Sequence, residues 1–295
     1  MANPQRPTRA RPARGAAAPL AVVALVVVLA AVTACARMVD GNANPESVPT
    51  APRTATTGSP EFPASEQIGT GDCISHPGFT VVDCALPHEL EVFRFDQLPA
   101  SFPSTYPTPA TLLPRFEPQC RAGLAGYVGS PEVDASRLRE FVYWPSQQGW
   151  RAGERWVLCA AVEIGPDDRP LRRTGALGGV LRGGLGELQA CSAGPPSQGT
   201  LRVVPCSTPH RGEAIPGVLV LGAPTDPPVS AEQANMVAEP HCRRATDAFL
   251  DARGGRPEVR YSWRYPLPES WPNGYTSVVC YAETATPVTG SLRNR

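Results

Sequence analysis

Eight cysteines form two sets of four with nearly the same spacing, and this pattern constrains the fold more than any other feature of the sequence. The second and third cysteines of each set are 36 residues apart, and the third and fourth are 39 residues apart in the first set and 38 in the second. The first set is Cys73, Cys84, Cys120 and Cys159, and the second is Cys191, Cys206, Cys242 and Cys280. The spacing predicts a tandem duplication in which each repeat carries its own cysteine framework.

Short motifs around the cysteines follow the same duplication. Cys-x-x-Pro-His-x-x-Glu runs from Cys84 to Glu91 and again from Cys206 to Glu213. Glu-Pro-x-Cys ends at the third cysteine of each set, and Trp-x-x-Gly precedes the fourth, at 150–153 and 271–274. Thr-Gly-x-Leu follows each repeat, at 174–177 and 289–292.

The N-terminus predicts export. Four arginines among the first 14 residues precede an apolar run from Ala16 to Val32, which is the layout of an export signal. The run ends in Val-Thr-Ala-Cys, similar to a bacterial lipobox, and Cys35 would then be the lipidated first residue of the mature protein. The alternative is an uncleaved helix over 16–34, because a membrane-spanning helix needs roughly 20 apolar residues. Both interpretations place the rest of the chain on the extracytoplasmic face of the cell membrane.

An extracytoplasmic location favours disulfides over metal thiolates or catalytic cysteines. Four cysteines allow three connectivities in each repeat. We favour the pairing in which a short-range disulfide staples a hairpin and a long-range disulfide ties a helix to a late strand. This pairing is Cys73–Cys84, Cys120–Cys159, Cys191–Cys206 and Cys242–Cys280.

The charge composition excludes one class of partner. All 27 basic residues are arginine, against 27 acidic residues. Because four of the arginines belong to the signal, the exported part has a slight acidic excess. It therefore has no basic excess with which to hold a nucleic acid.

The chain is expected to consist of an anchor over 1–35, a disordered tether rich in Pro, Ser and Thr over 36–67, and two repeats over 68–168 and 188–295. The Gly- and Arg-rich residues 169–187 are interpreted as a solvated hinge. Each repeat is predicted to be a small α+β domain, an antiparallel sheet with about one helix.

Apolar patterns place the elements of each repeat. In repeat one we expect strands over 80–84, 90–95 and 156–162, a proline-rich loop over 99–118 and a helix over 119–128. In repeat two we expect strands over 201–204, 217–221 and 276–281. Its helix should begin at the capping box of Ser230 and Gln233 and continue towards Asp251, with a kink or restart at Pro240.

Histidine is rare in this chain, and two of its four histidines lie in the duplicated Pro-His-x-x-Glu element. A His–Glu acid–base pair is one interpretation of His88 with Glu91 and of His210 with Glu213. Residues three apart on a regular strand point to opposite faces, and no Gly-x-Ser-x-Gly nucleophile accompanies them. We therefore favour a structural role, then a partner or ligand contact, and expect no catalytic residue, metal or cofactor.

The tryptophans allow two interpretations. Trp150 and Trp271 occupy equivalent positions near the end of each repeat. Aromatic side chains beside prolines could form a shelf for a glycan or a peptide, but in small disulfide-bonded domains they more often fill the core. We favour the core and keep Trp150 and Trp271 as possible contacts.

The motifs resemble the septum formation domain of actinobacterial envelope proteins. The resemblance lies in Gly-Asp-Cys-Ile at 71–74, Val-Asp-Cys-Ala-Leu-Pro-His-Glu-Leu-Glu at 82–91, the Trp-x-x-Gly segment and the trailing Thr-Gly-x-Leu. Repeat two lacks the Gly-Asp before its first cysteine. The resemblance implies a membrane-anchored, non-enzymatic protein of the cell envelope that is linked to cell division and binds an envelope protein or a cell-wall component. The alternative function is a solute- or glycan-binding lipoprotein.

Overall fold

The computed structural model describes residues 68–76, 79–99, 101–251 and 258–294. The export signal, Cys35 and the tether lie outside these residues. Within the described part, none of the helices combines the length and apolar character that crossing a membrane requires. Both repeats belong to one compact unit.

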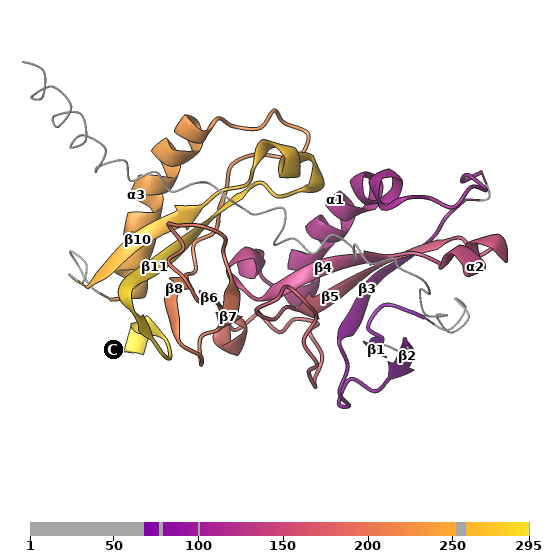
Figure 1. The fold of residues 1–295 in the computed structure, drawn as a ribbon, viewed down its shortest axis with the longest axis horizontal. Coiled ribbons are helices and arrows are strands. Elements are labelled where there is room, and N and C mark those ends of the chain that lie inside the picture. Colours follow the sequence, from indigo (N-terminus) through magenta and orange to yellow (C-terminus); the bar gives the residue numbers. More distant parts are fainter. Residues whose placement is uncertain (1–67, 77–78, 100, 252–257, 295) are drawn as a thin grey trace, which may run out of the picture. The chain divides into compact units, whose positions relative to one another are not determined.

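Repeat one contains a five-stranded antiparallel sheet in the order β2-β1-β3-β5-β4 (Figure 1). Its strands are β1 (Cys73–Ser75), β2 (Thr80–Val82), β3 (Leu90–Gln97), β4 (Leu138–Tyr143) and β5 (Trp156–Glu163). All eight residues of β5 are buried, as expected for the strand between β3 and β4 that lies beneath a helix.

Repeat two has the same topology. Its sheet runs β10-β11-β8-β6-β7, with β9 paired to β11, so strands equivalent in the duplication occupy equivalent places. The strands are β6 (Ala190–Ser192), β7 (Val203–Pro205), β8 (His210–Ala214), β9 (Leu219–Val220), β10 (Val259–Arg264) and β11 (Ser277–Val288). The α+β class and the antiparallel sheets agree with the sequence-based expectation.

The main helix of repeat one is longer than expected. Helix α1 (Pro109–Val128) includes ten residues that were predicted to be loop on account of their prolines. Pro109 opens the helix, where a missing N–H costs nothing, although Pro114 and Pro118 lie inside it. Burial of one apolar face outweighs their missing hydrogen bonds. That face consists of Leu112, Leu113, Phe116, Cys120, Leu124 and Val128.

Helix α3 (Ala231–Phe249) is the equivalent helix of repeat two. Its capping box is confirmed, since the Ser230 hydroxyl accepts the N–H of Gln233 at 3.1 Å and the Gln233 side chain accepts the N–H of Ser230 at 2.9 Å. Pro240 does not end the helix, which runs through it as one element. The remaining helices are short: α2 (Gln147–Arg151), η2 (Pro131–Ala135), η3 (Gly186–Leu188), η4 (Pro268–Asn273) and η5 (Leu292–Asn294).

Four disulfides connect these elements with the pairing favoured from the sequence. Cys120–Cys159 ties α1 to β5, and Cys242–Cys280 ties α3 to β11. Cys73–Cys84 and Cys191–Cys206 close the small hairpin at the start of each repeat.

Residues 169–187 are not a solvated hinge. Leu177, Leu181 and Leu185 are buried in the core of repeat one. The backbone N–H groups of Gly179 and Leu181 donate to the carbonyl groups of Tyr127 and Val128 at the end of α1. Leucines spaced four apart within a Gly- and Arg-rich segment hold it against repeat one, because burial of three leucines outweighs the solvation of its polar residues.

Candidate functional site

The Glu of each Pro-His-x-x-Glu element binds the Thr-Gly-x-Leu segment that follows its repeat. The Glu91 carboxylate accepts the N–H of Leu177, the N–H of Gly178 at 3.1 Å and the hydroxyl of Tyr127. The Gly175 N–H donates to the Cys84 carbonyl at 2.6 Å. The two motifs are therefore parts of one structural unit.

Repeat two repeats this arrangement. The Glu213 carboxylate accepts the N–H of Leu292 at 2.7 Å, and the Gly290 N–H donates to the Cys206 carbonyl at 2.7 Å. Burial raises the pKa of the Glu213 carboxyl above its ordinary value, although hydrogen bonds from Leu292 and Ser291 oppose the shift. Glu91 and Glu213 are both buried, so neither offers a surface to a partner.

The two histidines are buried in the same way. Nδ1 of His88 lies 2.8 Å from the Leu86 carbonyl, and Nδ1 of His210 lies 2.8 Å from the Thr208 carbonyl. Since a carbonyl can only accept, Nδ1 carries the hydrogen in both rings. Nε2 has no hydrogen-bond partner among the described residues in either ring. Each histidine therefore holds the turn that precedes its glutamate.

His88 and Glu91 do come together, because the turn before His88 replaces a regular strand. Their ligand atoms and the Cys73 sulfur all lie within 4.8 Å of one another. That sulfur is bonded to Cys84, so it is not the thiolate that a metal requires. Because all three residues are buried, a substrate could not reach the His–Glu pair, and the arrangement offers no acid–base site.

The tryptophans do not form a binding shelf. Trp150 is 1% exposed and Trp271 is 2% exposed. Their indole N–H groups donate to the carbonyl groups of Ser104 at 3.1 Å and Ala223 at 3.0 Å. Retaining them as ligand contacts was wrong, because each anchors the turn that carries it to an upstream loop of the same repeat.

A candidate contact surface is found on the outer faces of the two long helices, which sequence reasoning missed. The motif Glu-Pro-x-Cys is followed by arginine in both repeats, at Arg121 and Arg243. The cysteine points inward to its disulfide. The glutamate lies three residues before it, at the edge of the same face, and the proline and arginine lie farther round the helix. We call Glu117, Pro118 and Arg121 the outer face of α1, and Met236, Glu239, Pro240 and Arg243 the outer face of α3.

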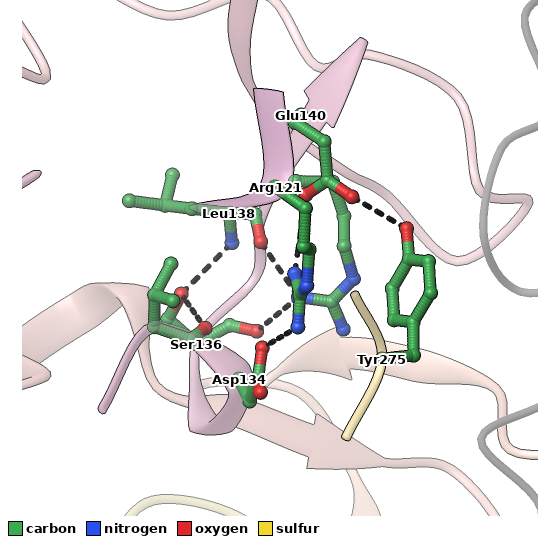
Figure 2. A network of polar contacts seen from close by, with 8 residues as sticks. Arg121, Asp134, Ser136, Leu138, Glu140 and Tyr275 are labelled. Carbon is green, nitrogen blue, oxygen red and sulfur yellow. Dashed lines mark hydrogen bonds and ion pairs between the residues drawn. The ribbon is translucent and has the colours of Figure 1, made fainter. Parts of the chain in front are cut away.

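The outer face of α1 is covered by repeat two. Figure 2 shows Arg121 beside Tyr275, which directly follows the Trp-x-x-Gly segment of repeat two. The guanidinium carbon of Arg121 lies 4.4 Å from the centre of the Tyr275 ring. The chain at Gly274 is so close that a Cβ there would lie 3.0 Å from Cγ of Arg121 and 3.8 Å from Cα of Pro118. We call this contact the inter-repeat junction.

Buried charges hold the junction together. Arg121 pairs with Asp134 and, at 3.1 Å, with Glu140 on β4. The Tyr275 hydroxyl donates to the other oxygen of Glu140 at 2.5 Å (Figure 2). A second contact supports it, since the Glu132 carboxylate accepts the N–H groups of Gly217 at 2.8 Å and Val218 at 3.0 Å.

The junction contains one carboxyl with a strongly shifted pKa. Burial and, secondarily, the nearby Glu140 carboxylate raise the pKa of Glu117 to about 7, although Arg121 opposes the shift. Glu117 is 8% exposed and has no hydrogen bond to another described residue. Its protonation near neutral pH therefore changes the charge of the junction.

The outer face of α3 is uncovered. Its Met236 side chain is 65% exposed, and both Glu239 and Arg243 are exposed. The neighbouring Val237 is 47% exposed. The duplication thus presents one helix face twice, buried against repeat two in the first case and open to solvent in the second.

Comparison with known proteins gives the family. The family model described as septum formation matches residues 44–141 and 117–280. Uncharacterized membrane proteins from two strains of Mycobacterium tuberculosis, CDC 1551 / Oshkosh and ATCC 25618 / H37Rv, are each 27% identical to this chain over 212 residues. This alignment covers 66% of the chain but 46% of each relative, so the chain spans less than half the length of the curated relatives that it matches. No solved structure matches the chain. Since the two family matches together cover most of its sequence, the chain belongs to the septum formation family.

Proposed function

We propose that this protein is a membrane-anchored, extracytoplasmic docking module of the cell envelope that acts in septum formation without catalysing a reaction. Its family and its membrane-protein relatives support the envelope assignment. The N-terminal arginines and apolar run support the anchor, and four disulfides suit an oxidising compartment outside the cytoplasm.

The observation that carries the docking role is the exposed outer face of α3. A 65% exposed methionine beside a 47% exposed valine is an apolar surface with a charged rim, the composition of a protein contact. The equivalent face of α1 binds protein, namely repeat two. A helix face that binds protein in one repeat and stays open in the other is best explained as a contact for a further protein domain.

The burial of the His–Glu pairs supports a non-enzymatic role. The residues with the chemistry for acid–base catalysis, His88 with Glu91 and His210 with Glu213, are inaccessible and hold backbone segments in place. The glycan-binding alternative depended on exposed Trp150 or Trp271, and both are buried.

The test is the cellular position of the full chain fused to a fluorophore that matures outside the cytoplasm. We expect enrichment at the septum of dividing cells, and we expect Met236→Asp to disperse it by placing a charge on the outer face of α3. Leu86→Asp is the matched control, because Leu86 is a 54% exposed apolar residue in repeat one. Uniform envelope signal from the unsubstituted protein would contradict the septal role, and septal enrichment of Met236→Asp would contradict the docking face.

A further inference from the structure

The inter-repeat junction has two halves, and the chain contains each half twice. One half is the outer face of a long helix, with the sequence Glu-Pro-x-Cys-Arg at 117–121 and 239–243. The other half is the turn that begins with Trp-x-x-Gly, at 150–153 and 271–274. Only the outer face of α1 and the second Trp-x-x-Gly turn meet each other within the chain.

The two Trp-x-x-Gly turns share a left-handed glycine and the same kind of anchor, although the first follows the α-helix α2 and the second follows the 3-10 helix η4. Gly153 has a φ of 98° and Gly274 a φ of 92°, a left-handed conformation that favours glycine. Each follows a buried tryptophan whose indole N–H is bonded to an upstream carbonyl. Repeat one therefore carries a turn that resembles the one that repeat two packs against α1.

Their surroundings differ. A Cβ on Gly274 would meet Arg121 and Pro118 of α1, whereas a Cβ on Gly153 would meet nothing within 4 Å. Arg151 and Ala152 beside Gly153 are exposed. At Gly153, the first Trp-x-x-Gly turn therefore contacts no helix among the described residues. The outer face of α3, which is equivalent to the surface that the second turn contacts on α1, is likewise exposed.

We propose that a second copy of this chain docks its first Trp-x-x-Gly turn on the outer face of α3, which repeats between chains the junction that joins the two repeats within one. This inference rests on the proposed docking function and names its partner. The duplication indicates this partner, because the chain itself carries a second Trp-x-x-Gly turn, and such a turn is what contacts the Glu-Pro-x-Cys-Arg face of α1.

Charge complementarity supports this occupant. Glu154 stands in the first turn where Tyr275 stands in the second. Within the chain, Tyr275 lies against Arg121. Glu154 is half-buried, and its carboxylate accepts the indole N–H of Trp156 at 3.0 Å. Between copies, the negative charge of Glu154 would lie against Arg243, the equivalent of Arg121. An aromatic–guanidinium contact is thereby replaced by a pair of opposite charges, which suits a more exposed contact.

The contact is heterologous, because the two surfaces that meet are different. The first turn follows α2 of repeat one, and the outer face of α3 belongs to repeat two. A copy bound through one of these surfaces leaves its other surface free. Repeated head-to-tail contacts of this kind build open chains of molecules when the rotation between copies does not close a ring.

Photo-crosslinking of the full chain in its membrane tests the inference. A benzoylphenylalanine at position 236 lies on the outer face of α3, at a side chain that is already exposed. We expect an adduct of two copies whose cross-linked peptide falls within residues 140–155. Arg243→Glu should lower the yield roughly tenfold or more, because it sets two glutamates against each other across the contact.

Arg244→Glu is the matched control, since Arg244 is an exposed arginine beside Arg243, and it should leave the yield unchanged. Resistance to proteolysis checks that each variant is folded. An adduct with a different protein, or one mapped elsewhere on a second copy, would overturn the self-docking inference and leave the proposed docking function standing. The lack of any adduct at position 236 would overturn both.

Discussion

Tyr275 of repeat two donates its hydroxyl hydrogen to Glu140 of repeat one at 2.5 Å, across 135 residues of sequence. The same ring lies against Arg121, which pairs with the other oxygen of Glu140. Burial and the Glu140 carboxylate both raise the pKa of Tyr275 well above its ordinary value, so the phenol remains a donor at every physiological pH. One tyrosine thus completes the hydrogen bonding of a buried ion pair in the other repeat.

Tyr275→Phe should therefore destabilise the protein. It leaves one oxygen of the buried Glu140 without its donor, and an unpaired buried polar group costs about 1–3 kcal/mol. The measurement is denaturant unfolding of the purified chain in detergent. Tyr265→Phe is the control, because Tyr265 is only half-buried and should change the free energy of unfolding by less than about 0.5 kcal/mol.

Glu117→Gln should remove a pH dependence from the stability. The folded-state pKa of Glu117 is about 7, against an ordinary value of 4.5, so the folded state holds a proton that the unfolded chain releases between these pH values. Stability is therefore full below pH 4.5, falls as the pH rises towards 7 and then levels off, with a loss on the order of 3 kcal/mol.

The check is the difference in the free energy of unfolding between Glu117→Gln and the unsubstituted protein from pH 5 to 8. The variant should gain relative stability as the pH rises. Glu213 also has a raised pKa, but its contribution is common to both proteins and cancels in the difference. Parallel pH curves would show that Glu117 titrates as an ordinary exposed carboxyl.

Glu91→Ala should release the segment that follows repeat one. The substitution removes the acceptor for the N–H groups of Leu177 and Gly178 and for the Tyr127 hydroxyl. We expect a loss of roughly 3 kcal/mol, since hydrogen bonds to charged groups contribute about 1.5–3 kcal/mol each. Hydrogen exchange at residues 174–178 should rise by more than exchange elsewhere in repeat one. Protection of these amides equal to that in the unsubstituted protein would contradict the assigned role of Glu91.

The two disulfides of repeat one should contribute differently to the free energy of unfolding. Replacing both members of Cys120–Cys159 by serine should cost about 1 kcal/mol more than replacing both members of Cys73–Cys84. The reason is loop length, because the sequence separations are 39 and 11 and the entropy of loop closure grows with the logarithm of length. Thermal unfolding of the two double variants gives the comparison. An equal or reversed order would mean that loop entropy does not dominate.

The sequence allowed the repeats, the cysteine pairing and the antiparallel sheets to be predicted, since each depends on local spacing. The predicted helix was shorter than α1. The low helix propensity of Pro114 and Pro118 was given more weight than the buried apolar face that includes Phe116 and Cys120. Tertiary burial overrides such local preferences.

The inter-repeat junction could not be predicted from either repeat alone. Arg121 and Arg243 follow the same motif, yet one is packed against a tyrosine and the other is exposed. The difference arises from the order of the repeats along the chain, and no periodicity within a repeat encodes it. The only signal was the fifth residue of Glu-Pro-x-Cys-Arg, a charge that is repeated beside the cysteine on each helix.

The capture of a trailing segment by Glu91 and by Glu213 has a consequence for export. The proposed extracytoplasmic location requires export, and a chain that is exported unfolded delivers its N-terminal parts first. Repeat one lacks the N–H donors of Leu177 and Gly178 until these residues have crossed, and repeat two lacks that of Leu292 until it has crossed in turn. Each repeat therefore gains the hydrogen bonds of its glutamate only when its own last segment arrives, and repeat one gains them before repeat two does.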